Sequence, residues 1–503
     1  MASENATPLG TRAMRLLPLL SRKPFSASRR RLLLGSILSL ASGSLGIRAQ
    51  ELLQLAGRPP GTLPALFDDL ERRTFAFFWE TTNPANGLVP DRFPTPSFSS
   101  IAAVGFGLTA YPIGVERGFV SRAQARHRVL ETLEFLRVLP QGKAEEGTAG
   151  FRGFFYHFLD FRSGLRTRRC ELSTIDTTWL LAGALFCQSY FVGAHNQEVR
   201  IRALAEELYQ RADWQWAQRR APLIAMGWRP EEGFLAYDWR GYNEAMMVYV
   251  LALGSPSHPV GADAWDAWTK TYDDTWGSFY GQTHLGFAPL FGHQYSHVWL
   301  DLRDIRDDYM RRRGLDYFEN SRRATLAQRA YAIANPGRWK GYDENVWGLA
   351  ACDGPGTMEI ADYAGERRAF RDYSARGAGL RHGFDDGTIA PTAAASSLPF
   401  APEIVIPAVE EMKRRYGKTI YSTYGFVDAF NPSFTAKVPL THGRVDPELG
   451  WADTDYLGID QGPILAMIAN YRSELVWRVM RTNAHVRRGL ERAGFTGGWL
   501  DAR

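Results

Sequence analysis

Three clusters of carboxylic acids lie among aromatic and glycine residues in this 503-residue chain. They are Glu171-Leu-Ser-Thr-Ile-Asp176, Gly241-Tyr-Asn-Glu244, and Trp451-Ala-Asp-Thr-Asp455 with the nearby Gly458-Ile-Asp460. Enzymatic cleavage of a glycosidic bond uses two carboxyl groups that flank the bond, one protonated and one ionised. Aromatic rings can stack on the apolar faces of sugars. Any single acid could instead cap a helix or pair with an arginine, but the three clusters together favour a carbohydrate site.

Glu244 is the candidate general acid. It follows Tyr242 and Asn243 and precedes the apolar segment 245–253. Free N–H groups at the start of a helix stabilise an ionised carboxylate, and that role alone could explain the position. Apolar neighbours act in the opposite direction and raise a carboxyl pKa toward the value that a general acid needs.

Three aspartates compete for the role of general base. Asp460 precedes the last long helical segment and could simply cap it. Asp453 and Asp455 are flanked by Trp451 and Tyr456. One ionised carboxylate is sufficient to activate water, and the sequence does not choose among the three.

Other polar and aromatic residues are candidates for substrate binding. Glu171 and Asp176 would point roughly 140° apart on one helix, so we expect one of them in the preceding turn. Both are expected to bind substrate or to support the acid. Residue type alone adds further candidates, each of which could instead belong to the core or surface: Arg92, Tyr156, His157, Trp239, Tyr242, His293, Trp347 and Trp451.

His293 and His297 stand four residues apart, with Asp301 one helical turn later. This spacing can hold zinc, but the glutamate of the zincin motif is absent. We therefore expect neither a metal nor a cofactor, and we assign His293 to sugar hydrogen bonding or to structure.

The acid clusters must be positioned by the elements between them. Apolar periodicity predicts about twelve helices and no alternating strand pattern, which indicates an all-α fold of paired helices closing a ring. Long loops rich in glycine, proline and aromatics separate them and carry the acids. The expected helices are 65–80, 100–116, 121–139, 173–193, 197–217, 242–254, 262–272, 293–304, 316–334, 343–351, 401–416, and 461–470 with a continuation to 492.

The basic residues of the chain are concentrated at its N-terminus. The first 31 residues hold seven Arg or Lys against one acid, an excess of six, while the whole chain carries a net charge of +5. The remainder is nearly neutral, which argues against nucleic acid as a partner. Ser28-Arg-Arg-Arg-Leu-Leu-Leu34 precedes a short apolar run and resembles a twin-arginine export signal.

We therefore divide the chain into an export signal (1–49), a linker (50–63) and one catalytic domain (64–503). The expected location is the periplasm or the extracellular space, without stable membrane insertion once the signal is removed. The three cysteines do not have zinc-site spacing, and a Cys170–Cys352 disulfide is left open.

Several of these motifs resemble the glucoamylase-like domain family. They include Glu171-Leu-Ser-Thr-Ile-Asp-Thr177, Gly241-Tyr-Asn-Glu-Ala-Met-Met247 and Leu253-Gly-Ser-Pro-Ser-His258. The family contains the endo-β-1,2-glucanases of glycoside hydrolase family 144, and the resemblance covers roughly residues 63–492. It implies an (α/α)6 toroid, a metal-independent inverting hydrolase with its cleft at one end of the ring, and Glu244 as a catalytic residue.

The expected function is hydrolysis of a β-linked glucan, with β-1,2 as the expected linkage. One alternative is a toroidal polysaccharide lyase that uses Tyr242, His293, Tyr295 and His297, and another is a glycan-binding protein without activity. Endo or exo action, chain length and oligomeric state are left open. Hydrolysis by inversion requires Glu244 and one of the three aspartates to face one cleft, about 6.5–9.5 Å apart or farther if a hydroxyl relays the proton.

Overall fold

Six helices form the buried interior of the part of the chain that the computed structural model describes, residues 62–381 and 383–502. The predicted export signal and linker residues 50–61 lie outside this part. The inner helices are α4 (Ile101–Glu116), α6 (Thr174–Tyr190), α9 (Met246–Gly254), α11 (Tyr295–Trp299), α14 (Pro391–Ala395) and α16 (Gly458–Ser473). All nine residues of α9 are buried, as expected for a helix that is apolar on every side.

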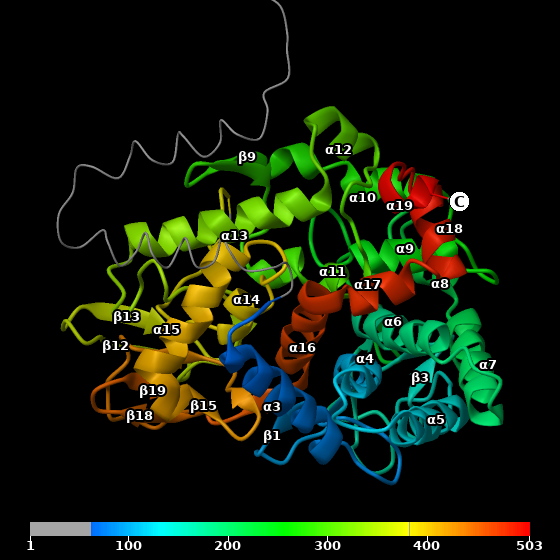
Figure 1. The fold of residues 1–503 in the computed structure, drawn as a ribbon, viewed down its shortest axis with the longest axis horizontal. Helices are drawn as coiled ribbons and strands as arrows, with labels where there is room; N and C mark the ends of the chain where they lie inside the picture. The colour runs from blue at the N-terminus through cyan, green and yellow to red at the C-terminus, as the bar shows by residue number, and fades with distance from the viewer. Residues whose placement is uncertain (1–61, 382, 503) are drawn as a thin grey trace, which may run out of the picture. The chain divides into compact units, whose positions relative to one another are not determined.

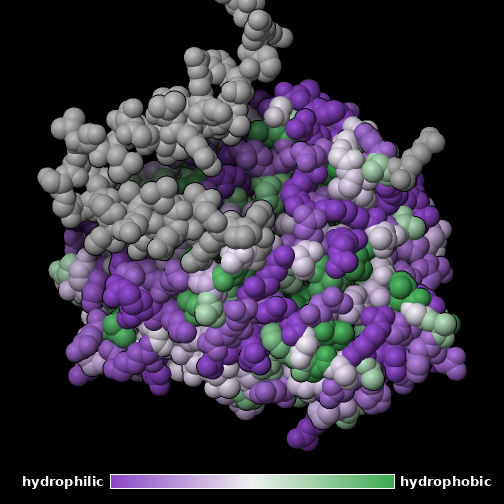
Figure 2. All heavy atoms as spheres, in the orientation of Figure 1, coloured by the Kyte–Doolittle hydropathy of each residue, from purple (hydrophilic) through white to green (hydrophobic). Residues whose placement is uncertain are grey.

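Longer helices with one apolar face cover the inner ones. They are α3 (Ala65–Thr81), α5 (Arg122–Val138), α7 (Asn196–Arg211), α13 (Tyr317–Ala334), α15 (Pro402–Ile420) and α18 (Ala484–Arg492). In α3 the buried residues Phe67, Leu70, Thr74 and Phe78 recur at helical spacing. The face of the described chain shown in Figure 2 is accordingly mostly polar, with apolar side chains in small groups.

The inner helices contact one another in chain order. Helix α4 packs against α6, α6 against α9, and α16 against α11, α14 and α4 (Figure 1). The Met247 N–H donates to Ser296 Oγ over 3.1 Å and links α9 to α11. The Gln294 side chain donates to the Ala393 carbonyl over 2.7 Å and links α11 to α14. The last inner helix therefore touches the first.

Short antiparallel strands join the loops that precede the inner helices. β1 (Arg92–Phe93) pairs with β20 (Tyr456–Leu457), and β2 (Ser99–Ser100) pairs with β5 (Phe158–Leu159). Two three-stranded sheets have the orders β6 (Leu172–Ser173), β7 (Gly227–Arg229), β8 (Gly233–Phe234) and β17 (Phe430–Asn431), β19 (Gly450–Ala452), β18 (Arg444–Asp446). The expectation of an all-α chain is thus right for the framework and incomplete for the loops, because two-residue strands are too short to show alternation.

The remaining elements are short. The two-stranded pairs are β3 (Gly150–Phe151) with β4 (Phe154–Phe155), β9 (Trp276–Phe279) with β10 (Gln282–Leu285), β11 (Ala351–Cys352) with β14 (Ser374–Ala375), β12 (Met358–Ala361) with β13 (Arg367–Phe370), and β15 (Tyr421–Ser422) with β16 (Gly425–Phe426). The other helices are α8 (Trp214–Ala217), α10 (Asp263–Thr269), η2 (Tyr272–Asp274), η3 (Leu290–His293), α12 (Asp308–Arg313), α17 (Leu475–Met480) and α19 (Gly498–Asp501).

Several helix predictions were wrong in extent or kind: the helix expected at 197–217 divides into α7 and α8, the one expected at 262–272 ends at Thr269, and three others differ more. The segment 343–351 is not helical, because the Asp343 side chain accepts the N–H groups of Asn345 and Val346 and Gly348 has φ +140°. The helix expected at 293–304 shortens to α11. The continuation to residue 492 breaks at Glu474, which adopts a left-handed conformation (φ 53°).

The three cysteines are free and buried, so the Cys170–Cys352 disulfide is not formed. Among the described residues, no helix combines the length and the apolar character that crossing a bilayer would need.

Glycines allow two helix pairs to approach closely: the inner helices α4 and α6, and the inner helix α9 with the outer helix α18. A Cβ on Gly183 of α6 would lie 2.1 Å from the Gly105 carbonyl oxygen of α4, and a Cβ on Gly105 would lie 2.2 Å from the Trp179 carbonyl oxygen. Gly489 of α18 approaches the Val250 carbonyl of α9 in the same way, at 2.0 Å. The obstructing atoms are helix backbone, so they cannot move independently to make room.

We expect Gly183→Ala to lower the free energy of unfolding by about 1–3 kcal/mol, because the added methyl group forces α4 and α6 apart. Gly417→Ala in α15 is the matched control, since its Cβ would meet only the Lys413 side chain at 3.4 Å. The control should be neutral or stabilising by about 0.5–1 kcal/mol, because alanine favours helix. Urea unfolding measures both, and equal stability of the two variants would contradict close packing at Gly183.

Candidate active site

Glu244 lies in the turn that leads into α9. The Ser296 hydroxyl donates to its backbone carbonyl over 2.9 Å and holds this turn against α11. Its Oε2 atom is buried and has no hydrogen-bond partner among the described residues. Burial raises the pKa of Glu244 to about 7, with a contribution from the Asp176 charge, while its own backbone N–H opposes the rise. Near neutral pH the residue can therefore hold and give up a proton.

The first acid cluster forms an ion-pair network beside Glu244. His157 Nδ1 lies 2.9 Å from Glu171 Oε1, and its Nε2 lies 3.7 Å from Asp176 Oδ1. Ser173 caps α6 through the Asp176 N–H and also donates to the Asp176 carboxylate. Burial lowers the pKa of His157, but the carboxylates of Asp176 and Glu171 outweigh it and raise that pKa to about 9. His157 is thus a cation at neutral pH.

The second acid cluster consists of Asp353, Asp428, Asp453 and Asp460, which are at most 2% exposed. The Asp353 N–H donates to Asp428 Oδ2 over 2.6 Å. Asp428 and Asp460 are neighbours, and the ionisation of one affects that of the other. Burial raises the pKa of both, and the nearby Asp353 charge raises it further. The pair can therefore present one ionised and one protonated carboxyl group.

Among the described residues, each of these four carboxylates uses one oxygen for a hydrogen bond within the protein and leaves the other oxygen without one. Asp353 Oδ2 accepts from Arg92 over 2.7 Å, and Asp453 Oδ1 accepts from the Thr454 N–H over 2.6 Å. Four buried atoms have no hydrogen-bond partner in the described part of the chain: Asp353 Oδ1, Asp428 Oδ1, Asp453 Oδ2 and Asp460 Oδ2. Substrate hydroxyls or water could satisfy them.

The same groups are the ones that could hold a cation. One oxygen from each of Asp353, Asp428 and Asp453 lies within 4.8 Å of the others, and Asp353, Asp372 and His442 form a second such group. Carboxylate oxygens suit Ca²⁺ or Mg²⁺. The Arg92 guanidinium, 2.7 Å from Asp353 Oδ2, offsets part of this negative charge.

Tyr295 and Ser296, neighbours in α11, contact the segments that carry Asp460 and Glu244. The Tyr295 hydroxyl lies 3.5 Å from Asp460 Oδ1 and is oriented to donate to it. Burial raises the pKa of Tyr295, and the charges of Asp460 and Glu244 both raise it further. Residues 244 and 460, distant in sequence, are thus brought to the same region at the start of α9 and α16.

Asp455 and Arg92 join the loops at this region. Asp455 Oδ1 accepts the Thr95 N–H over 3.0 Å, and its Oδ2 lies 3.7 Å from Arg92. Both oxygens of Asp455 therefore hold the segment around β1, which favours a structural role for Asp455 over the role of general base.

Two cavities lie near these residues. Arg92 lines a cavity of about 620 Å³. Tyr242 and Asn243, which precede Glu244, line a separate cavity of about 400 Å³.

Several aromatic candidates are too buried to stack on a sugar, which corrects the expectation that they line the cleft. Tyr156 is fully buried, and the Arg166 guanidinium covers its ring at 4.6 Å. Trp347 and Trp451 are at most 1% exposed, and Trp451 donates to the His442 carbonyl over 2.8 Å. Trp239 is 7% exposed and donates to Thr174 Oγ1 over 2.9 Å. These residues shape the walls behind the acids.

The two histidines of the 293–297 segment are also interior residues. His293 Nε2 lies 3.2 Å from the Phe287 carbonyl, and His297 Nε2 lies 3.1 Å from Ser321 Oγ. Burial lowers the pKa of both, to about 3 for His297, so both are neutral. Asp301 is paired with Arg303 and Arg481 and does not complete a metal site with them.

Sequence reasoning missed Asp353, Asp428 and His442. Asp428 lies in Gly425-Phe-Val-Asp-Ala-Phe-Asn431, a mixture of acid, glycine and aromatics like that of the three recognised clusters, so the same criterion could have found it. Asp353 precedes Gly354-Pro-Gly356, which marks only a turn. His442 stands in a loop without any recognisable motif.

Comparison with known proteins gives consistent matches. A family model named Glycoamylase, described as "putative glucoamylase", matches residues 236–484. An exo β-1,2-glucooligosaccharide sophorohydrolase (non-reducing end) of Parabacteroides distasonis is 27% identical over 465 residues, or 86% of this chain. The chain spans 58% of that relative's length.

Two solved structures match nearly the whole of their own chains. An endo-β-1,2-glucanase from Chitinophaga pinensis, in complex with sophorotriose and glucose, is 27% identical with a TM-score of 0.73, covering 87% of this chain and 99% of its own. A "putative glucoamylase" from Bacteroides uniformis is 31% identical with a TM-score of 0.73, covering 87% and 98%. On this identity and coverage, together with the family model, the chain belongs to the glucoamylase-like family.

Proposed function

We propose that this protein is a glycoside hydrolase that cleaves β-1,2-linked glucan. The observation that carries the proposal is two acid groups with buried carboxyl oxygens, whose segments both contact α11: Glu244, with a pKa of about 7, held through Ser296, and Asp460, with its neighbour Asp428, held through Tyr295. The linkage is inferred from the names of the relatives, one an exo-acting sophorohydrolase and one an endo-β-1,2-glucanase.

We also propose that the helices form an (α/α)6 toroid. The inner helices α4, α6, α9, α11, α14 and α16 follow one another, and α16 returns to α4. Asp176 and Asp460 lie in the first turns of α6 and α16, and Glu244 lies just before α9. Loops at the N-terminal ends of the inner helices would then surround one opening that binds the glucan.

In the proposed reaction Glu244 transfers its proton to the glycosidic oxygen as the bond from that oxygen to the anomeric carbon breaks. A water molecule adds to the opposite face of the anomeric carbon and gives a proton to the ionised carboxylate of Asp460. The direct attack of water inverts the configuration. Solvent then returns a proton to Glu244 and removes one from the aspartate pair, which restores the starting state.

The free oxygens of Asp353 and Asp453 would accept hydrogen bonds from sugar hydroxyls. These carboxylates are held in place before substrate binds, so little rearrangement is needed. The lyase alternative loses support, because His293 and His297 are buried and hydrogen-bonded inside the protein. A binding protein without activity would not need two such acids with raised pKa values.

We expect Glu244→Gln to lower kcat on β-1,2-glucan about 10²–10⁴-fold, because general acid catalysis contributes that much. A sophorosyl fluoride needs no proton on its leaving group, so E244Q should still hydrolyse it, whereas Asp460→Asn should lose activity on both substrates. Product NMR should show the inverted anomer first.

Asp266→Asn, at an exposed position of α10, is the control and should keep full activity. Asp453→Asn and Asp455→Asn test the other two aspartates. If one of these variants loses all hydrolytic activity while D460N stays active, that aspartate is the general base. Assays with EDTA and with added CaCl₂ test whether the Asp353, Asp428 and Asp453 group needs a cation. Retention of the anomeric configuration would refute the mechanism.

The pH profile should report Glu244. Activity requires Glu244 to be protonated, so kcat/KM should fall as pH rises through about 7. The Asp176 charge raises the pKa of Glu244, so its removal in Asp176→Asn should ease ionisation of Glu244 and move the descending limb to lower pH. Asp266→Asn should leave the limb in place, and an unmoved limb in D176N would show that another group limits the rate.

We further propose that the protein is exported through its N-terminal signal. The support is the Ser28-Arg-Arg-Arg-Leu-Leu-Leu34 pattern and the basic excess of the first 31 residues. Replacement of Arg29 and Arg30 by lysine should leave the protein in the cytoplasm, because twin-arginine export reads both arginines. Fractionation followed by immunoblotting measures this, and unchanged export of the double variant would exclude that route.

A further inference from the structure

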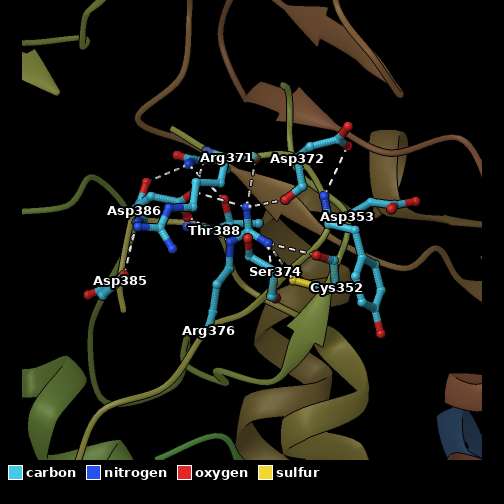
Figure 3. Close-up of polar contacts among 12 residues, drawn as sticks. Cys352, Asp353, Arg371, Asp372, Ser374, Arg376, Asp385, Asp386 and Thr388 are labelled. Carbon is cyan, nitrogen blue, oxygen red and sulfur yellow. Dashed lines mark hydrogen bonds and ion pairs between the residues drawn. The ribbon is translucent and has the colours of Figure 1, made fainter. Parts of the chain in front are cut away.

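A buried arginine holds a loop tip at the edge of the acid cluster. The tip is Asp372-Tyr373-Ser374, and the arginine is Arg376, which directly follows β14 (Ser374–Ala375). Arg376 is 0% exposed. Its Nε and Nη2 atoms donate to the two Asp386 oxygens over 2.8 and 2.9 Å, as Figure 3 shows. This bidentate pair compensates the cost of burying both charges.

The other N–H groups of Arg376 bind backbone carbonyls before and after Tyr373. Nη2 donates to the Arg371 and Asp372 carbonyls over 2.9 and 3.2 Å, and Nη1 donates to the Ser374 carbonyl over 3.4 Å (Figure 3). Nη1 also donates to the Cys352 carbonyl over 2.6 Å, next to Asp353. One guanidinium therefore fixes the backbone on both sides of Tyr373 and ties it to the strand that leads to the acids.

The tip faces the second acid cluster. Asp372 Oδ1 accepts the Tyr373 N–H over 2.9 Å and lies 3.4 Å from His442 Nε2, while His442 Nδ1 lies 3.2 Å from Arg92. The Tyr373 hydroxyl is near Asp460, Asp428 and Asp353, whose charges add to burial in raising its pKa.

The Tyr373 ring has an open surface. The residue is 51% exposed. No aromatic ring of the described residues packs on it, in contrast to the buried tryptophans behind the acids. An amphipathic ring with one end at the catalytic groups and a free face suits the apolar face of a sugar.

We propose that Tyr373 stacks on a sugar ring of the glucan beside the acid cluster, and that Arg376 is a positioning residue that acts through Tyr373. This inference rests on the proposed function and adds a substrate contact to it. Arg376 touches no substrate, and its role is to keep the loop tip in one conformation before the glucan binds.

The variants Tyr373→Ala, Tyr373→Phe and Arg376→Lys test the proposal with β-1,2-glucan as substrate. Tyr373→Ala should raise KM about three- to tenfold with kcat within about twofold, the size of one aromatic contact. Tyr373→Phe keeps the ring and should keep KM within about twofold. Tyr363→Ala, at a 44% exposed tyrosine of the β12–β13 hairpin, is the control and should behave as the wild type.

Arg376→Lys keeps a charge for Asp386 but cannot bind all the carbonyls around Tyr373. It should raise KM as Tyr373→Ala does, and the Tyr373→Ala/Arg376→Lys double variant should be no worse than either single one, because both remove the same contact. Additive effects would overturn the positioning role of Arg376. If R376K fails to fold, the Tyr373 variants still decide whether the ring binds substrate.

The outcomes separate this inference from the proposed function. A wild type that does not cleave β-1,2-glucan overturns both. An active wild type with an unchanged KM in Tyr373→Ala overturns only the inference, and so does a Tyr373→Phe variant that loses as much as Tyr373→Ala.

Discussion

The burial of more carboxylates than nearby cations can neutralise is the constraint on which this site depends. Asp353, Asp428, Asp453 and Asp460 are almost completely buried, and Arg92 is the arginine that contacts them directly. Four unpaired charges in such a place would be very costly. Burial and the neighbouring carboxylates therefore raise the pKa of Asp428 and of Asp460, so this pair can hold a proton near neutral pH.

The other charged groups of the site follow the same physical rule in different ways. His157 stays protonated because two carboxylates face it, and Arg376 is buried because Asp386 and four backbone carbonyls satisfy its donors. Glu244 has a buried carboxyl oxygen and no ion pair with any residue that the structure describes, and burial makes it neutral up to a higher pH than an exposed glutamate. Paired groups thus give the site its rigidity, and the unpaired ones give it proton chemistry.

The helical framework explains how acids from distant segments can meet. Inner helices begin where the clustered acids lie, and glycine contacts such as Gly105 with Gly183 let those helices approach closely. Short strand pairs, for example β1 with β20, then fix the loops between them. Buried backbone groups need hydrogen-bond partners, and strand pairs, turns and side chains supply many of them in these loops.

The sequence by itself determined the family, the long helices and three of the acid clusters. A helix such as α3, expected at 65–80 and found at Ala65–Thr81, can be read locally because its apolar residues repeat every turn. The acid clusters could also be predicted from the sequence, because the acids, aromatics and glycines of each cluster are close together in the chain. Only the tertiary structure distinguished Asp455, bound to Arg92 and Thr95, from Asp460, paired with Asp428. It also added Asp353, His442 and Tyr373, because ion pairing and burial depend on residues that lie far apart in the chain.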